Sequence, residues 1–164
     1  MNSQSFHFES PTMYDFEWYY NLRKRTMFEH FMNAGKGWPE ELERARHREG
    51  YNPNTLRIIC LGDKRIGCIN VAKSSEGLHV NAFCVEPEYQ RKGYGARVLQ
   101  QILDEPENRD IPCTLDVLIH NPSYRIYERL GFVRVEGPNP ILVYYARPAP
   151  PQQYILSSNI MPKP

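Results

Sequence analysis

The segment Val85–Ala96 (VEPEYQRKGYGA) holds the residue types best suited to binding a phosphate group. Gly93 and Gly95 have no Cβ atom, so the chain can curl tightly and a phosphate can come close to the backbone. An apolar helical pattern follows, and a helix N-terminus offers unpaired N–H groups and the positive end of the helix dipole. Arg91 and Lys92 add full positive charges beside it. The segment therefore predicts a pyrophosphate-binding loop at the start of a helix.

Two well-known phosphate motifs do not describe this loop. The Walker A motif G-x-x-x-x-G-K-[ST] is absent, and the Rossmann fingerprint G-x-G-x-x-G requires a glycine where Val98 stands. Taken alone, the glycine pair is equally compatible with a turn that merely starts a helix.

Two motifs together indicate a family. The sequence Gln90-Arg91-Lys92-Gly93-Tyr94-Gly95-Ala96 resembles the Q/R-x-x-G-x-G/A signature of the GNAT N-acetyltransferases. Residues 121–132 (NPSYRIYERLGF) resemble the family's second motif, N-P-A-R-R-L-Y-E-R-L-G-F. The resemblance covers residues 56–146 well, and the first 50 residues match only in element order and in residues 37–41. Ser123 and Tyr124 depart from the family's usual Ala-Arg.

The resemblance implies acetyl-CoA as the cofactor and assigns its contacts. In the family, the strand before the loop carries a bulge and splays from its parallel neighbour, and the pantetheine arm enters between them. Phe83, Cys84 and Val85 would offer backbone groups to that arm, and the Val85 N–H would polarise the thioester carbonyl. Asn121 would bind the arm from the other side, with Ser123 beside it. The pyrophosphate would rest on the amides of Gln90, Arg91, Lys92, Gly93, Tyr94, Gly95 and Ala96.

Tyr127, six residues after Asn121, is the predicted proton donor to the leaving group. A thiol resembling cysteine has a pKa of about 8.5, against about 10 for tyrosine, so full proton transfer is uphill by roughly 2 kcal/mol. We therefore expect Tyr127 to donate a hydrogen bond first and its proton late. The alternative is a core tyrosine whose hydroxyl caps a strand.

An amine must lose a proton before it attacks, so a base is needed. Strict alternation along residues 78–85, before any bulge shifts the register, places His79 on the same face as Phe83 and Val85. Imidazole titrates near neutral pH, which makes His79 the leading candidate, and a half-exposed surface histidine is the alternative. Weaker candidates for the base are Glu29, His30, Glu40 and Glu41. Three aromatic residues are candidates for lining the substrate site, with core packing as their alternative: Phe31, Trp38 and Tyr51.

The elements that position these residues follow from periodicity and turn signals. They predict an α/β fold, a mixed and mostly antiparallel central sheet flanked by helices, in the order β-α-α-β-β-β-α-β-α-β-β. The expected strands are 5–9, 56–61, 65–72, 78–85, 114–119, 132–135 and 141–146, and the expected helices are 13–32, 39–48, 93–103 and 122–130. Residues 1–146 form the acyltransferase domain. A proline-rich arm, residues 147–164, follows, with Tyr154, Ile155 and Leu156 as its candidates for packing onto the domain.

Composition narrows the partners. The net charge of +1 and the lack of a basic stripe argue against nucleic acid. The sequence has no apolar run of about 18 residues to cross a membrane and no signal peptide, which predicts a cytoplasmic protein. The four cysteines form no CxxC pair, so we expect buried free thiols and neither disulfides nor a metal. The strand 141–146 is a candidate edge for a homodimer.

These observations favour an N-acetyltransferase (EC 2.3.1 type) that acetylates the primary amine of a small molecule. Two alternatives stay open: a CoA-binding sensor or regulatory module without turnover, and acetylation of a protein lysine or N-terminus. A phosphate-loop NTPase is least compatible, because no P-loop lysine or Mg²⁺ ligand set is evident.

Overall fold

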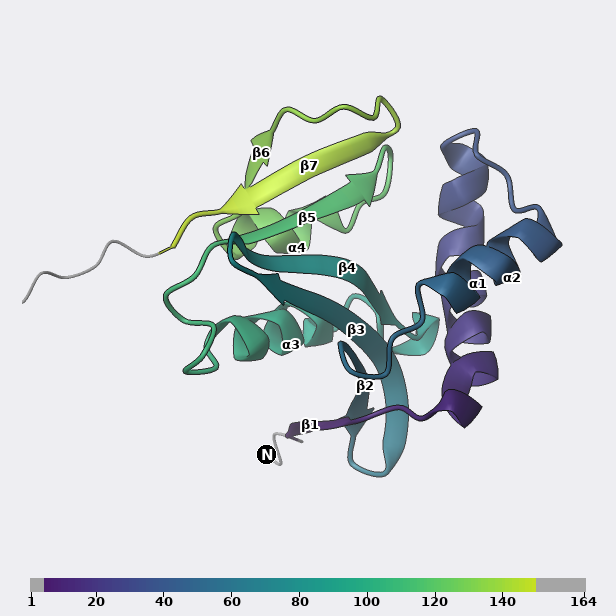
Figure 1. Cartoon of the computed structure of the whole chain (residues 1–164), viewed down its shortest axis with the longest axis horizontal. Coiled ribbons are helices and arrows are strands. Elements are labelled where there is room, and N and C mark those ends of the chain that lie inside the picture. Colours follow the sequence, from purple (N-terminus) through teal and green to yellow (C-terminus); the bar gives the residue numbers. More distant parts are fainter. Residues whose placement is uncertain (1–4, 150–164) are drawn as a thin grey trace, which may run out of the picture.

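The computed structural model describes residues 5–149, which form one mixed sheet between two layers of helices (Figure 1). Within this range the sheet has seven strands in the order β1-β2-β3-β4-β5-β7-β6, and all neighbours are antiparallel except β4 and β5. The strands are β1 (Phe6–Glu9), β2 (Leu56–Leu61), β3 (Lys64–Ser74), β4 (Gly77–Val85), β5 (Cys113–Leu118), β6 (Val133–Val135) and β7 (Leu142–Arg147). The predicted class and element order are confirmed.

The helices divide between the two faces of the sheet. They are α1 (Phe16–Asn33), α2 (Glu40–Glu49), α3 (Tyr94–Leu103) and α4 (Tyr124–Arg129), with short 3-10 turns at Met13–Asp15 and Pro87–Tyr89. One apolar cluster packs α3 and α4 on the sheet, and a second, rich in aromatic side chains, packs α1 on the opposite face. A capping box lies ahead of α1, where Thr12 N–H donates to Asp15 Oδ2 at 2.8 Å.

The parallel strands β4 and β5 pair along only part of their length. Their ladder covers Leu78–Val80 against Cys113–Leu115, and no further pairing follows in the described chain. Just beyond, β4 carries a bulge: Val80 pairs with Val71 and Ala82 with Asn70, which leaves Asn81 without a partner on β3. A bulge adds one residue and bends the strand. The two strands therefore separate toward their carboxyl ends.

The expected dimer edge is wrong. The strand at 141–146 is β7, and it lies inside the sheet between β5 and β6. The edge strands of the described sheet are β1 and the exposed three-residue β6. The sheet also extends one residue beyond the predicted domain boundary, to Arg147. The predicted packing of Tyr154, Ile155 and Leu156 lies outside the described residues, and none of the described helices has the length and apolar character that a membrane span requires.

Candidate active site

The separation of β4 and β5 opens a cavity of about 280 Å³. It is lined by Val80, Asn81, Ala82 and Phe83 of β4, Leu115, Asp116, Val117 and Leu118 of β5, Asn121, Ser123 and Tyr127 at α4, Arg23, Met27 and Phe31 of α1, and Lys36 and Leu142. We call this cavity the acyl cleft. Of the predicted site residues, it brings together Phe83, Asn121, Ser123, Tyr127 and Phe31.

The bulge at Asn81 overturns one sequence prediction. Strict alternation placed His79 and Phe83 on one face, but the extra residue reverses the alternation beyond it. Phe83 packs with Leu78 and Val80 in the core beneath α3, and His79 points to the opposite face, on the side of α1. His79 is not among the residues that line the acyl cleft.

The backbone amides of the predicted phosphate loop are free. Arg91 and Gly93 have φ values of 60° and 79°, in the left-handed region, and Gly93 is the N-cap residue of α3. Within residues 5–149, no hydrogen-bond acceptor serves the N–H groups of residues 91–96. Alternation of left- and right-handed conformations turns successive N–H groups toward one centre, which suits an anion.

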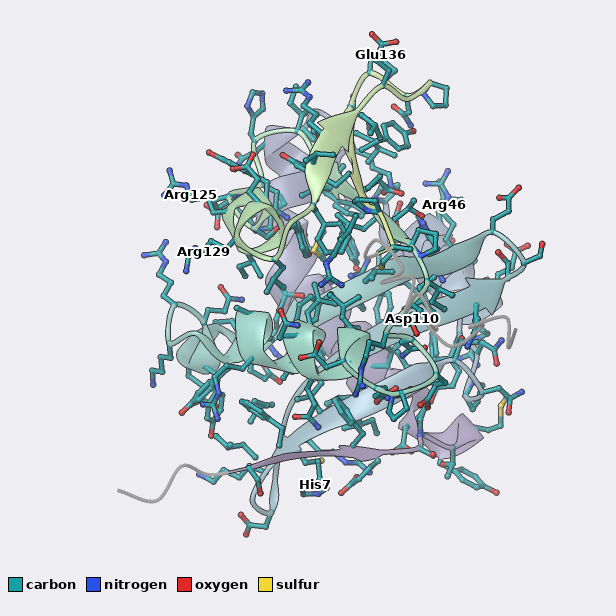
Figure 2. The ribbon with its side chains drawn as sticks, turned by 90° about the vertical axis from the view of Figure 1, so that its left-hand side faces the viewer. His7, Arg46, Asp110, Arg125, Arg129 and Glu136 are labelled. Atoms are coloured by element: carbon teal, nitrogen blue, oxygen red, sulfur yellow. The ribbon has the colours of Figure 1, made fainter. Side chains whose placement is uncertain are left out.

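Neighbouring contacts hold this loop in place. The Gln90 side-chain amide donates to Val85 O at 2.8 Å, which ties the loop to the end of β4. A Cβ atom on Gly95 would lie 3.4 Å from Ile126 Cδ1, so α3 and α4 approach closely there. Figure 2 shows Arg125 and Arg129 projecting from α4 on the side of the molecule where α3 begins. The loop therefore has a positive surrounding as well as a positive helix end.

The free N–H groups of β4 point into the separation. Glu86 N–H donates to Ile66 O at 2.7 Å, and backbone directions alternate along an antiparallel ladder. The Val85 N–H is therefore turned away from β3, toward the side where β5 has separated. Neither Val85 nor Cys84 lines the acyl cleft with its side chain, which agrees with backbone roles for both.

Tyr127 is buried and lines the acyl cleft. Burial raises the pKa of its hydroxyl to about 12, and the adjacent Ser123 side chain opposes that rise. Its ring meets Phe132 edge to face, with 6.0 Å between the centroids. Beside it, Asn121 Oδ1 accepts a hydrogen bond from Ser123 N–H at 3.0 Å, which orders the turn that leads into α4. The hydroxyl is therefore protonated at neutral pH, on a ring that packs against its neighbours.

Asp116 is a functional candidate that sequence reasoning missed. It lies on β5, lines the acyl cleft, and its Oδ2 is 3.7 Å from Nε2 of His79. His79 Nδ1 lies 2.8 Å from Thr114 Oγ1, so the imidazole is held between two β5 side chains. Asp116 is the one charged residue in the apolar run 114–119, a signal that was available in the sequence.

Arg23 is the second missed residue. Its Nη1 donates to Cys84 Sγ at 3.0 Å, and its buried Nε has no acceptor in the described chain. Cys84 faces Cys68 across β3 and β4. The hydrogen bond from Cys68, and then the charge of Arg23, lower the pKa of Cys84, while the pKa of Cys68 is raised. The signal in the sequence was a cation inside the apolar stripe of a helix, four residues before Met27.

Two of the three predicted substrate aromatics are packed elsewhere. Phe31 lines the acyl cleft, and its ring centroid is 4.9 Å from that of Trp38. Trp38 is buried behind it and donates to Tyr20 Oη at 3.2 Å. Tyr51 Oη donates to Thr12 O at 2.6 Å, and its ring packs on Phe16 at the start of α1. Trp38 and Tyr51 thus support the α1 wall and do not line the acyl cleft.

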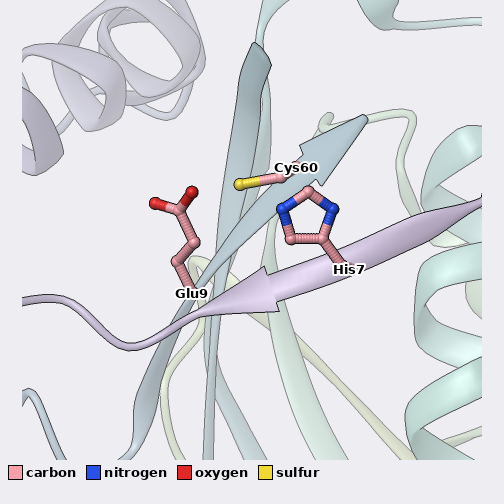
Figure 3. Close-up of side chains that lie close together, drawn as sticks. All are labelled: His7, Glu9 and Cys60. Atoms are coloured by element: carbon pink, nitrogen blue, oxygen red, sulfur yellow. The ribbon is translucent and has the colours of Figure 1, made fainter. Parts of the chain in front are cut away.

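A cluster outside the acyl cleft contains possible metal ligands. His7, Glu9 and Cys60 place their ligand atoms within 4.8 Å of one another where β1 pairs with β2 (Figure 3). Glu9 Oε2 accepts from Arg65 Nε at 3.0 Å, and burial raises the pKa of Cys60 to about 11. A thiol must lose its proton to bind a metal, so both features oppose coordination. All four cysteines are buried and free, as predicted.

Comparisons with known proteins agree with this geometry. Residues 14–132 match the Acetyltransferase (GNAT) family. The fold resembles PaiA N-acetyltransferase from Thermoplasma acidophilum in complex with coenzyme A (TM-score 0.69, 17% identity, 88% of this chain and 99% of that one). It also resembles an acetyltransferase from Thermus thermophilus (TM-score 0.70, 18% identity, 90% of this chain and 99% of that one). A third similar structure is the ribosomal-protein-S18-alanine N-acetyltransferase from Escherichia coli (TM-score 0.66, 18% identity, 96% of this chain and 99% of that one). No curated protein matches the sequence significantly.

Proposed function

The chain belongs to the GNAT acetyltransferase family, whose acyl donor is acetyl-CoA, and on that premise we propose that it acetylates the primary amine of a small molecule. The amine attacks directly, in a ternary complex with both substrates bound. The observation that carries this proposal is the acyl cleft, because one cavity borders a proton donor, a carboxylate and an open stretch of strand backbone. Acetyl-CoA supplies the activated acetyl group as a thioester.

The described residues fit the phosphate part of acetyl-CoA. Six consecutive N–H groups, residues 91–96, have no acceptor in the described chain, at the start of a ten-residue helix. An unpaired buried or half-buried donor costs free energy, and a pyrophosphate would satisfy several of these donors at once. We assign the phosphates to this loop, and the pantetheine arm to the edge of β4 that β5 leaves free.

Tyr127 acts on the leaving group. Because burial raises the pKa of Tyr127 to about 12, the hydroxyl is protonated at neutral pH. A thiol pKa of about 8.5 lies about 3.5 lower, so complete proton transfer would cost about 5 kcal/mol. Tyr127 therefore stabilises the developing negative charge chiefly as a hydrogen-bond donor. This strengthens the sequence-based expectation, since the difference is larger than that between a free tyrosine and a thiol.

Asp116 and His79 together provide the base. Asp116 borders the acyl cleft and can take the proton of the attacking amine, directly or through a water. His79 lies next to Asp116, with 3.7 Å between His79 Nε2 and Asp116 Oδ2. We assign the contact with the amine to Asp116, and to His79 the positioning of that carboxylate. The Val85 N–H, turned toward the free edge of β4, serves the developing oxyanion.

Titration calorimetry followed by an acceptor screen tests the proposal. We expect micromolar binding of acetyl-CoA and CoA, no binding of ATP, and acetylation of small amines in preference to peptides. Tyr127→Phe should lower kcat at least tenfold and leave the affinity for CoA within about twofold. Wild-type turnover should show no loss from Tyr127 ionisation below about pH 11, because its pKa is about 12.

The matched control is Tyr145→Phe. Tyr145 is also buried, with its ring centroid 6.4 Å from that of Tyr127, but it does not line the acyl cleft. Equal losses in the two variants would indicate a packing effect and contradict the role of Tyr127. Binding of CoA without acetylation of any acceptor would favour a non-catalytic CoA-binding module, and turnover of peptides alone would favour a protein acetyltransferase.

A further inference from the structure

One wall of the acyl cleft has polar groups that acetyl transfer does not use. Arg23, Met27 and Phe31 are spaced four residues apart on α1, so they form one stripe along the helix, and all three line the cleft. Lys36, from the turn after α1, joins them. This wall lies across the cleft from β5, which carries Asp116.

Arg23 has donors to spare at the cleft. A guanidinium has five N–H donors and no acceptor. In the described chain Arg23 makes one side-chain hydrogen bond, from Nη1 to Cys84 Sγ at 3.0 Å, and its Nε–H is buried without an acceptor. Nε is shielded from the cleft, whereas Nη2 makes no hydrogen bond in the described chain and is not a buried atom. Nη2 is therefore the Arg23 donor that an acceptor group of a ligand in the cleft can reach.

The Arg23 guanidinium lacks hydrogen-bond acceptors more than it lacks a compensating charge. Cys84, with its lowered pKa, offsets the charge of Arg23 but engages only one terminal nitrogen. Four further titratable groups are near enough to feel the charge of Arg23: Tyr19, Cys68, Tyr127 and His47. Burial raises the pKa values of Tyr19 and Tyr127 and lowers that of His47. A hydrogen bond with Cys84, and then burial, raise the pKa of Cys68, so all four groups are held in their neutral forms. The ligand group that matches a guanidinium fork best is a carboxylate, which offers two oxygens in one plane.

Resting on the proposed function, we infer that the acceptor amine also carries a carboxylate, as an amino acid does. Arg23 binds the carboxylate, with Lys36 as a second cation on the same wall. Met27 and Phe31 contact the carbon skeleton, and Asp116 faces the amine. A polyamine carries no acceptor group for the Arg23 donors, so it fits this wall less well.

Pairs of acceptors that differ only in the carboxylate test this inference. We would compare an amino acid with its decarboxylated amine, for example phenylalanine with phenethylamine and leucine with isoamylamine, by following CoA release. The wild type should show kcat/KM at least tenfold higher for the carboxylate-bearing member of a pair. Arg23→Lys keeps the charge but removes the fork, and should reduce this preference at least tenfold, through KM.

Arg23→Lys could disturb folding, because Arg23 also contacts Cys84. A second variant therefore tests the same wall without changing that contact. Lys36→Met removes a cation of the same wall without touching the Arg23–Cys84 contact, and should lower the preference two- to fivefold. It also removes the Lys36 contacts with Glu43 Oε1, 3.8 Å away, and with the Phe31 ring, 4.1 Å to the centroid. Binding of CoA, measured by calorimetry, reports that each variant is folded.

A missing preference for carboxylate-bearing amines and a missing acetylation activity have different consequences. Equal kcat/KM for both members of every pair would overturn the carboxylate while leaving the small-amine acetyltransferase intact. A preference that survives Arg23→Lys and Lys36→Met unchanged would overturn the assignment to this wall. CoA binding with no acetylation of any amine would overturn the proposed function instead.

Discussion

The start of α3 and the inner face of α1 offer two kinds of binding surface. At α3 the donors are backbone N–H groups of residues 91–96, placed by one left-handed glycine and the helix end. At α1 the donors and contacts are side chains, Arg23, Met27 and Phe31. Backbone donors serve a ligand part common to a family, and side chains can change with the acceptor. The cofactor can therefore be inferred from a short sequence motif. The acceptor can be inferred only from the side chains that meet in the folded cleft.

We expect the largest loss of activity when the proposed base, Asp116, is removed. Asp116→Asn keeps the size of the side chain but takes away its negative charge, so kcat should fall about 100-fold or more. Acetyl-CoA affinity should stay within about twofold, because the phosphate loop is made of backbone. Steady-state kinetics and calorimetry on the same preparation measure both quantities.

Asp110→Asn is the matched control, since Figure 2 shows Asp110 at the other end of α3, away from Arg125 and Arg129. The control should keep wild-type kcat. His79→Gln should cost less than Asp116→Asn, about tenfold, as expected for a positioning residue. A larger loss with His79→Gln than with Asp116→Asn would reverse the two assignments.

The backbone surface is tested next by adding a Cβ atom. Gly93 has φ 79°, and a Cβ atom there would meet nothing within 4 Å, so Gly93→Ala acts through backbone strain alone. The left-handed conformation costs a residue with a side chain about 1–2 kcal/mol, which converts to about 5- to 30-fold weaker binding of CoA if the loop relaxes.

Gly62→Ala is the matched control for this test. Gly62 also has a left-handed φ, 62°, and a Cβ atom there would meet nothing within 4 Å, but it lies in the turn between β2 and β3 and is no part of the phosphate loop. Calorimetry with CoA should show less than a threefold change. If the two variants weaken binding equally, the conformation of Gly93 is not what arranges the free amides.

Most of the fold followed from local patterns, because each pattern is set by neighbours in the sequence. The strand 56–61 was predicted to the residue, and the helix at 93–103 begins one residue later, after Gly93. The bulge at Asn81 was not predictable at a given residue, because it depends on register against β3. That single extra residue moved His79 off the predicted face.

The missed site residues share one cause. Arg23 and Cys84 are 61 residues apart in sequence and meet only when α1 packs on the sheet. Asp116 and His79 meet only because β4 and β5 are parallel neighbours. Motifs recover groups that act through the backbone, such as residues 91–96, whereas side chains that converge from distant segments require the structure.

The smallest expected effect on CoA binding is that of Lys92. Lys92 is exposed, with its Nζ 5.8 Å from the centroid of the Tyr89 ring, so it adds charge near the phosphate loop without being part of its backbone. Lys92→Ala should weaken CoA binding only two- to fivefold at low ionic strength, and the difference should disappear near 0.5 M salt, where exposed charges are screened. The effect of Gly93→Ala should persist at that salt, because backbone strain is not screened. Lys64→Ala, on β3, provides the control for a loss of one positive charge. A Lys92→Ala effect that exceeds tenfold or resists salt would mean that side chains carry the phosphates here, and the contrast between the two surfaces would then fail.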